Sequence, residues 1–511
     1  MEVGPGGGAV FDVGFNATGF ICAEIECTEP GTIWIAFDEI LDADGLVSAG
    51  RLTTANAVRF DLAPGRHAVE SFEPYTFRYL HAFAVQGRFA VSGVRVRTYR
   101  SPAADAASFR SSDPDADRIF AAARETFAQN AVDVFTDCPS RERAGWLCDS
   151  FFIGRASALL TGSTDLERLF LGNYAAAEKF EDIPDGMLPM LYPGDSIGGL
   201  YIPNWAMWFA IEAAEYLERS GDRATVDALK PRLLKLVELL WRKRGPEGML
   251  EYLDGWVFVE WSKANEWVGG ANFPTNATWA AVLDAMDRMY GMPELAAEAE
   301  RVRAAVRRLS FDGAWFRDNA VRGADGALAA EDHRSETCQY YMFFFGVATP
   351  QSHPALWRTL LDDFGPGRAA TGKHAEIAPS NAFIGNFLRL ELLSRAGLGR
   401  KLFEESKGYF GYMAARTGTL WEMTGDAASC NHGFASHVAV FYARNLAGIE
   451  KTDLAARRVS LAPRESLLDL PLEHCEATLP LPGGKLEISW RKTPAGGVER
   501  AAAAPEGWVV E

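Results

Sequence analysis

The sequence has a shortage of cationic side chains. It contains 51 lysines and arginines against 68 aspartates and glutamates, which gives a formal net charge of −17. Binding to a nucleic-acid backbone needs a cationic surplus that releases counterions. The composition therefore argues against nucleic acid as the main partner. It does not identify a substrate, because an acidic surface also serves solubility.

Long apolar runs are absent as well. No stretch of 18 apolar residues occurs, and residues 1–19 have neither the basic start nor the sustained apolar segment of a signal peptide. We therefore expect no membrane partner and a cytoplasmic location.

Cysteines are few and irregularly spaced. The seven cysteines do not form a disulfide pattern, and Cys138 and Cys148 lack the partners of a zinc site. Asp42-x-Asp44-Gly45 lacks the remaining ligands of a calcium loop and indicates a turn. No Gly-rich phosphate loop, metal triad or Ser-His-Asp arrangement is apparent. We expect no metal and no other cofactor.

The chain length of 511 residues predicts about two to four domains. Residues 1–105 contain short β-rich runs, such as 33–37 and 77–85, separated by turn residues, which is typical of an antiparallel β-sandwich. Residues 110–448 have helical periodicity. Residues 449–511 return to strand-like runs and predict a second, smaller sandwich.

The helical region divides into roughly twelve segments. Tight joins, such as those at 220–222 and 290–293, make neighbouring helices antiparallel. Six such hairpins would close into an (α/α)6 toroid, whose site-forming loops we expect at 181–203, 244–273 and 365–379. The expected helices span 115–130, 142–161, 165–179, 204–219, 224–243, 274–290, 294–309, 334–347, 354–364, 380–396, 399–414 and 432–447.

The most informative stretch is residues 136–149. If a helix begins near Glu142, then Glu142, Trp146 and Asp149 share one face at i, i+4 and i+7. The preceding loop carries Asp137. An acid for the leaving oxygen and a flat apolar wall for the ring are what a sugar-cleaving site needs. The alternative is a capped, salt-bridged helix end, because acids are favoured in first turns.

The same stretch resembles the Asp-Cys-Pro-(x)-Arg-(Asp)-Glu-Arg-x-Gly-Trp-x-x-Asp signature of the bacterial α-L-rhamnosidases, glycoside hydrolase family 78. The commonest family form has an extra Asp before the Glu, and this chain is one residue shorter there. Runs at 11–19, 38–45 and 73–79 are similar to the sandwich that precedes the catalytic domain in that family. The resemblance implies a multidomain chain, with a central all-α (α/α)6 toroid flanked by N-terminal and C-terminal antiparallel β-sandwiches. The matching signature residues are Arg141, Glu142, Arg143, Gly145, Trp146 and Asp149.

A second element lies near the end of the helical region. Thr419-Leu420-Trp421-Glu422 resembles the family's Thr-x-Trp-Glu element, and Asn431-His432 resembles its later Asn-His pair. The resemblance implies that Glu142 is a general acid and Glu422 a general base that activates water for an inverting attack. His432 is a candidate ligand for a sugar hydroxyl, although a histidine at a helix start also serves as a cap.

Substrate-binding roles follow from the same two elements. Asp137 and Asp149 would hold ring hydroxyls, with Trp146 beside them, and Trp421 is a further candidate to bind the substrate. Arg141 and Arg143 are candidates to pair with these two carboxylates and keep them charged.

An aromatic loop at 256–263 resembles the family's site loop between helices. Glu260 occupies roughly the place of its acidic residue and is a candidate to bind the substrate. Trp261 is a candidate wall for the apolar methyl face of the sugar. Trp205 and Trp208 are equally well explained as core residues.

The leading hypothesis is an inverting α-L-rhamnosidase that removes terminal α-L-rhamnose from glycosides or oligosaccharides without a cofactor. Another (α/α)6 carbohydrate-active enzyme remains an alternative, with a different deoxyhexose or uronate specificity or a lyase mechanism. A non-catalytic carbohydrate-binding relative is a third reading. The sequence also leaves a homo-oligomer open.

Overall fold

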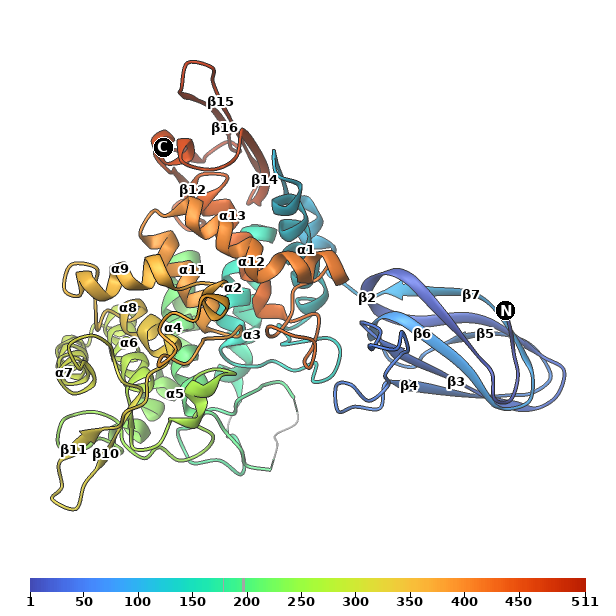
Figure 1. The fold of residues 1–511 in the computed structure, drawn as a ribbon, viewed down its shortest axis with the longest axis horizontal. Coiled ribbons are helices and arrows are strands. Elements are labelled where there is room, and N and C mark those ends of the chain that lie inside the picture. The colour runs from blue at the N-terminus through green and yellow to red at the C-terminus, as the bar shows by residue number, and fades with distance from the viewer. Residues whose placement is uncertain (178, 195–197) are drawn as a thin grey trace.

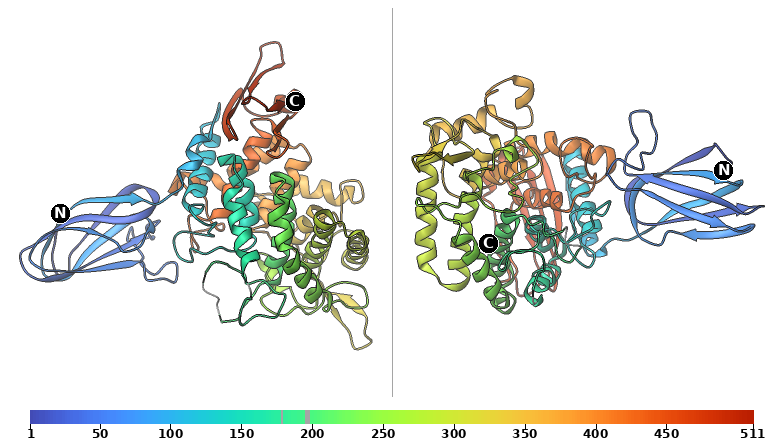
Figure 2. Two further views of the ribbon diagram at one scale, coloured as in Figure 1. Left: turned by 180° about the vertical axis from the view of Figure 1, so that it is seen from behind. Right: turned by 90° about the horizontal axis from the view of Figure 1, so that it is seen from below.

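A computed structural model describes residues 1–177, 179–194 and 198–511. An N-terminal antiparallel sheet stands to one side of a helical body, and C-terminal strands lie at another edge of that body (Figure 1). Two further views show the same arrangement (Figure 2). Position 178 of the expected helix 165–179 and positions 195–197 of the expected loop 181–203 lie outside the described residues.

The N-terminal sheet is built around one long strand. Strand β2 pairs with β6 through its first half and with β5 and β7 through its second half, and the sheet order is β1-β7-β2-β6-β3-β4. Ile21, Ile33 and Phe77 lie in a core of its own, separate from that of the helices. The strands are β1 (Glu2–Val3), β2 (Gly8–Cys27), β3 (Gly31–Asp38), β4 (Ala57–Leu62), β5 (Gly65–Glu70), β6 (Tyr75–Gln86) and β7 (Phe89–Thr98).

The helical body contains helices of two kinds. Those buried nearly all round include α4, α6, α8 and α11, whereas α5, α7 and α9 bury one face. The α-helices from α1 to α13 are α1 (Pro114–Asn130), α2 (Asp149–Thr161), α3 (Asp165–Ala176), α4 (Pro203–Ser220), α5 (Arg223–Trp241), α6 (Phe273–Tyr290), α7 (Pro293–Ser310), α8 (Glu336–Phe344), α9 (Pro354–Asp363), α10 (Arg368–Thr371), α11 (Gly385–Arg395), α12 (Gly399–Thr417) and α13 (Val438–Asn445).

The buried helices contact one another in sequence. Helix α2 contacts α4, α4 contacts α6, α6 contacts α8, α8 contacts α11, α11 contacts α13, and α13 returns to α2. The amphipathic helices lie against them, as α7 does against α6 and α12 against α11. The loops at one end of the buried helices therefore come from distant parts of the sequence.

The helix expected at 142–161 begins later than the sequence indicated. Helix α2 starts at Asp149, and the residues before it form a loop in which Arg143 and Cys148 have φ values of 53° and 71°. The cause is tertiary pairing, because Leu147 donates to the Met190 carbonyl over 2.9 Å. Bonds of this kind replace the helical ones, so Glu142, Trp146 and Asp149 do not share a helix face.

The C-terminal strands share a core with the helices. Strand β8 (Ser108–Ser111), which precedes α1, pairs with β14, and the Trp490 indole donates to the Leu446 carbonyl over 2.7 Å. The elements are β12 (Ile449–Asp453), β13 (Arg458–Leu461), α14 (Arg464–Leu468), β14 (His474–Leu481), β15 (Gly484–Lys492), β16 (Val498–Ala503) and β17 (Val509–Val510).

Among the described residues, no helix is long and apolar enough to cross a membrane. All seven cysteines are buried, and none of them forms a disulfide.

Candidate active site

A cavity of about 260 Å³ lies among the loops at one end of the buried helices. The loop before α2, the segment before α4 with its first turn, the segment between α5 and α6, the turn before α11 and the loop after α12 all contribute to it. Its lining residues are Asp137, Arg141, Glu142, Trp146, Asp149, Met190, Leu200, Ile202, Trp205, Trp256, Phe258, Trp261, Phe383, Glu422 and His432.

One guanidinium links the two proposed catalytic carboxylates. Arg141 Nη2 donates to Glu422 Oε2 over 2.9 Å, and Arg141 Nε lies 3.3 Å from Glu142 Oε1. The Glu422 side chain is 4% exposed, whereas that of Glu142 is 38% exposed. One carboxylate therefore lies deep in the cavity and the other stands where solvent reaches it.

The two arginines of the motif do not form the ion pairs with Asp137 and Asp149 that the sequence suggested. Arg141 pairs with Glu142 and Glu422. Arg143 pairs instead with Glu73, in the turn between β5 and β6 of the N-terminal sheet, at 2.8 Å. The irregular loop sends the two side chains in different directions, and sequence spacing alone does not predict this.

Asp137 and Asp149 are buried carboxyl groups with other carboxylates close by. Burial raises the pKa of Asp137 well above its usual value, and the Glu142 and Asp149 carboxylates raise it further. Burial also raises the pKa of Asp149, with Glu422 and Glu142 adding to the effect. These aspartates therefore retain protons more readily than exposed ones, and they offer both donors and acceptors to a polyhydroxylated ligand.

His432 faces the cavity and does not cap the helix that follows it. Its ring nitrogens lie 3.1 Å from Asp149 Oδ1 and 3.1 Å from Ser429 Oγ, and the following 3-10 helix (Gly433–His437) has no side-chain cap. Burial lowers the pKa of His432 to about 4. The imidazole is therefore neutral at neutral pH.

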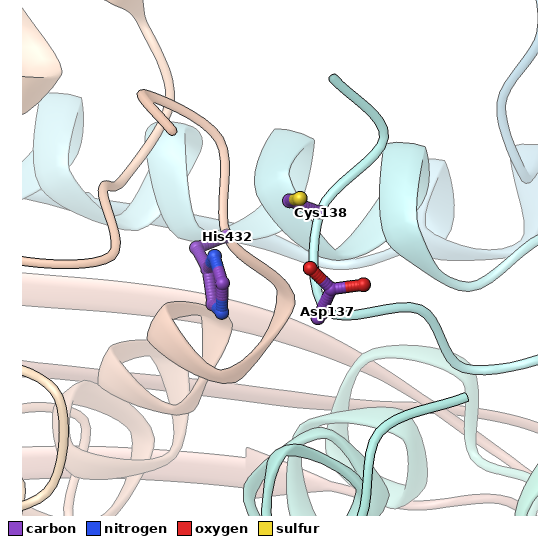
Figure 3. Close-up of side chains that lie close together, drawn as sticks. All are labelled: Asp137, Cys138 and His432. Carbon is purple, nitrogen blue, oxygen red and sulfur yellow. The ribbon is translucent and has the colours of Figure 1, made fainter. Parts of the chain in front are cut away.

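Asp137, Cys138 and His432 each place one potential metal-ligand atom within 4.8 Å of the others, and His432 faces the loop that carries the other two (Figure 3). A thiol binds metal as a thiolate. Here burial, followed by the Asp137 and Glu142 carboxylates, raises the pKa of Cys138 well above its usual value. The donor set therefore favours a hydrogen-bonding cluster over a preformed cation site.

Aromatic rings form an apolar wall of the cavity. The ring centroids of Phe258 and Trp261 are 4.7 Å apart, those of Phe258 and Trp205 are 4.8 Å apart, and Trp205 lies 5.7 Å from Phe383. Trp261 is 38% exposed at the edge of the wall. A wall of this kind suits the apolar face of a sugar ring.

Glu260, expected to contact substrate, lies behind the wall. It is fully buried and accepts hydrogen bonds from the Gly385 amide over 2.7 Å and from the Thr337 hydroxyl. Burial raises its pKa to about 8. A Cβ at position 385 would stand 2.2 Å from Oε1, so any larger residue there would have to displace the carboxylate. Glu260 thus anchors the start of α11, and its neighbour Trp261 faces the cavity instead.

Trp421, also expected to bind substrate, is a core residue. It is 1% exposed, and its indole donates to Thr417 Oγ1 over 2.8 Å. The adjacent Glu422 lines the cavity, so the two neighbouring side chains lie on different sides of the loop.

Polar atoms in the cavity loop have no hydrogen-bond partner among the described residues. They include Asp137 Oδ2, Arg141 Nε and Trp146 Nε1, all of them buried. Buried polar atoms are normally paired, so unpaired ones lining a cavity call for a partner supplied by a ligand. A ring with several hydroxyls offers the donors and acceptors required.

Sequence reasoning left some of the lining unassigned. Trp205 was equally well explained as core, and Phe383 lies at the end of a turn that carries no catalytic residue type. Of the expected site loops, 181–203 and 244–273 contribute residues to the cavity. Residues of the loop 365–379 instead line a neighbouring cavity of about 430 Å³, which shares Trp261.

Comparison with known proteins defines the class. The model of the bacterial alpha-L-rhamnosidase 6 hairpin glycosidase domain matches residues 104–446. The chain therefore belongs to the bacterial α-L-rhamnosidase six-hairpin glycosidase family, which confirms the resemblance seen in its motifs.

Individual relatives are distant. An alpha-L-rhamnosidase of Formosa agariphila is 20% identical over 94% of this chain and 52% of its own length. The structure of a GH78 family rhamnosidase of Bacillus sp. GL1 has a TM-score of 0.82 at 21% identity, covering 99% of this chain and 54% of that one. The chain thus spans about half the length of these two relatives.

A third relative is matched over most of its length. The rhamnosidase from Klebsiella oxytoca with rhamnose bound has a TM-score of 0.69 at 20% identity, covering 87% of this chain and 88% of that one. At such identities the structural likeness establishes the fold.

Proposed function

We propose that this chain is an inverting glycoside hydrolase that removes terminal α-L-rhamnose from glycosides or oligosaccharides. The observation that carries the proposal is the meeting of Glu142 and Glu422, from motifs far apart in the sequence, at the guanidinium of Arg141 in one cavity. Family membership and the names of the relatives support rhamnose as the sugar.

The exposures of the two carboxyls suggest their roles. Glu142, at 38% exposure, donates its proton to the glycosidic oxygen and regains one from solvent after the leaving group departs. Glu422, at 4% exposure, takes a proton from a water molecule that attacks the anomeric carbon from the opposite face. An inverting geometry places two such carboxyl groups about 6.5–9.5 Å apart, which leaves room for the water.

The remaining lining residues bind and polarise the sugar. Asp137, Asp149 and His432 contact ring hydroxyls, and the carboxyl groups stabilise the positive charge that develops on the ring. Trp146 offers its unpaired indole N–H to a hydroxyl. The aromatic wall takes the apolar methyl face of a 6-deoxy sugar, with Trp261 at its edge. No cofactor enters any of these steps.

Finer features of the fold are part of the same proposal. The cyclic order of helix contacts supports an (α/α)6 toroid over residues 110–448. The mostly antiparallel pairing on either side supports β-sandwiches at residues 1–105 and 449–511, with β8 adding a strand to the second and β13 and β17 pairing in parallel. We retain a cytoplasmic location as an expectation, and a homo-oligomer stays open.

Hydrolysis of aryl and alkyl α-L-rhamnopyranosides by wild type, Glu142→Gln and Glu422→Gln tests the proposal. Nitrophenol leaves easily without a proton, so Glu142→Gln should lose much more activity on the alkyl than on the 4-nitrophenyl glycoside. Glu422→Gln should lose about 10³-fold or more on both substrates. Glu238→Gln, at an exposed pair on α5, serves as the matched control.

Other outcomes identify the alternatives. An unsaturated product absorbing in the ultraviolet would indicate a lyase. Rhamnose binding without turnover by wild type would indicate a binding protein.

A further inference from the structure

We propose that the N-terminal sheet positions the general base, by holding the loop at residues 418–432 that carries Glu422. We call residues 418–432 the Glu422 loop. The kinetic part of this inference rests on the proposed function, whereas the structural part does not. The N-terminal sheet would then contribute to catalysis, although none of the residues of the sheet lines the cavity.

The first tether is an arginine of the sheet region. Arg51 donates through Nη1 to the carbonyls of Asp426 and Ala428, over 2.8 and 2.7 Å. Its other nitrogens are held by Asp38, at 2.7–3.1 Å. The guanidinium is only 12% exposed, so its direction is fixed by a buried carboxylate on the sheet side. The Arg51 side chain therefore binds two backbone oxygens of the loop simultaneously.

The second tether is a buried carboxylate. Glu39, just after β3, is fully buried and accepts from the Cys430 amide over 2.9 Å. It also accepts from Asn16 on β2 over 3.0 Å, and Asn16 contacts the Thr419 hydroxyl at 3.1 Å. Both ends of the Glu422 loop are therefore bonded to the sheet, with Glu422 between them.

A third connection runs through helix α1. Thr18 on β2 donates to Gln129 Oε1 over 2.7 Å, and the same oxygen accepts from Asn431 over 2.7 Å. Asn431 precedes the cavity residue His432. The connection is buried throughout, where hydrogen bonds are strong and an unpaired partner is costly.

The sheet also contacts the loop of the general acid. Arg143, next to Glu142, donates to Glu73 Oε2 over 2.8 Å and to the Pro74 carbonyl over 3.1 Å. The two proposed catalytic carboxylates thus stand on irregular loops that share the N-terminal sheet as a support. Their separation decides whether a water molecule fits between substrate and base, and a shift of about 1 Å costs about 10²-fold in rate.

The kinetic test compares Arg51→Ala with Arg78→Ala. Arg78 also reaches from the sheet to the helical body, where it donates to the Arg416 carbonyl in α12 over 3.0 Å, outside the Glu422 loop. For Arg51→Ala we expect kcat to fall at least tenfold with KM within threefold, because the base acts on water and not on sugar binding. Arg78→Ala should keep kcat within threefold. Arg51→Lys keeps the charge but lacks the fork, and should recover kcat only in part.

The structural readout is amide hydrogen exchange, which needs no turnover. Arg51→Ala should speed exchange at Cys430 and its neighbours, with helices α4 and α6 unchanged as an internal check on folding. A folded Arg51→Ala protein with wild-type exchange in residues 418–432 would overturn the proposal, and so would kcat within twofold of wild type. Wild type that exchanges as expected but releases no rhamnose would overturn the proposed function and leave the tether standing.

Discussion

Arg141 and Glu422 are 281 residues apart in the sequence, yet Nη2 of the guanidinium lies 2.9 Å from Oε2 of the carboxylate. The same guanidinium approaches Glu142 from its Nε side at 3.3 Å. A rigid planar fork is suited to holding two carboxylates in a fixed relation. Arg141 therefore sets where the proposed acid and base stand relative to each other.

Replacing Arg141 tests this relation. Arg141→Lys keeps a positive charge but not the fork, and Arg141→Ala removes both. A hydrogen bond to a charged group contributes about 1.5–3 kcal/mol, so we expect kcat to fall about 10- to 100-fold for alanine and less for lysine. Steady-state kinetics on an aryl rhamnoside measure both variants. Equal activity of Arg141→Ala and wild type would contradict the assignment.

Two tryptophans should respond to substitution in opposite ways. Trp261 is 38% exposed at the cavity edge, whereas Trp421 is 1% exposed in the core. Trp261→Ala should raise KM about three- to tenfold with little change in thermal midpoint. Trp421→Ala should cost about 3–5 kcal/mol of stability. Kinetics and thermal unfolding of both variants, measured together, distinguish the two roles. A higher KM for Trp421→Ala with no loss of stability would show that Trp421 binds the substrate.

Glu260 should make the protein less stable as the pH rises. Burial raises its pKa in the folded state to about 8 from an ordinary 4.5, so the folded state holds a proton that the unfolded state releases. Its contribution is present below pH 4.5 and is lost as the pH rises through about 8, at a cost on the order of 5 kcal/mol.

The variant Glu260→Gln checks this assignment, because glutamine mimics the protonated acid. Its free energy of unfolding should fall less than that of wild type between pH 5 and pH 8.5. Denaturant unfolding at both pH values measures the difference, and parallel pH profiles for the two proteins would refute the assignment.

His432 should act in the opposite direction. Its pKa is lowered to about 4 in the folded state from an ordinary 6.5, so the unfolded state binds a proton first. Stability from this group is full above pH 6.5 and is lost as the pH falls through about 4, at a cost on the order of 3 kcal/mol. His432→Gln should weaken this acid sensitivity. The check is denaturant unfolding at pH 4.5 and pH 7, where an unchanged difference between the two pH values would count against a buried neutral imidazole.

The sequence predicted the residue types of the site better than their geometry. The motifs around Glu142 and Glu422 are local patterns, and the structure brings both to one cavity. The start of α2 was misplaced because residues 145–147 bond to the distant segment 190–193, and no local pattern encodes that pairing.

The direction of neighbouring side chains was also beyond sequence reasoning. Glu260 and Trp261 are adjacent, and only packing against Gly385 decides that the carboxylate points inward and the indole outward. Trp421 and Glu422 are also adjacent, and packing places the indole in the core and the carboxylate in the cavity. The bond from Arg51 to the Ala428 carbonyl joins the region of the N-terminal sheet to a loop of the helical body, so it follows from the assembled fold alone.

The anomeric form of the first product tests the central claim most directly. Proton nuclear magnetic resonance can follow hydrolysis of an α-L-rhamnopyranoside by wild type on a time scale shorter than mutarotation. We predict that β-L-rhamnose appears first and the α-anomer only later, because water activated by Glu422 attacks the face opposite the leaving group. Release of α-L-rhamnose first, or no release of rhamnose at all, would contradict the account.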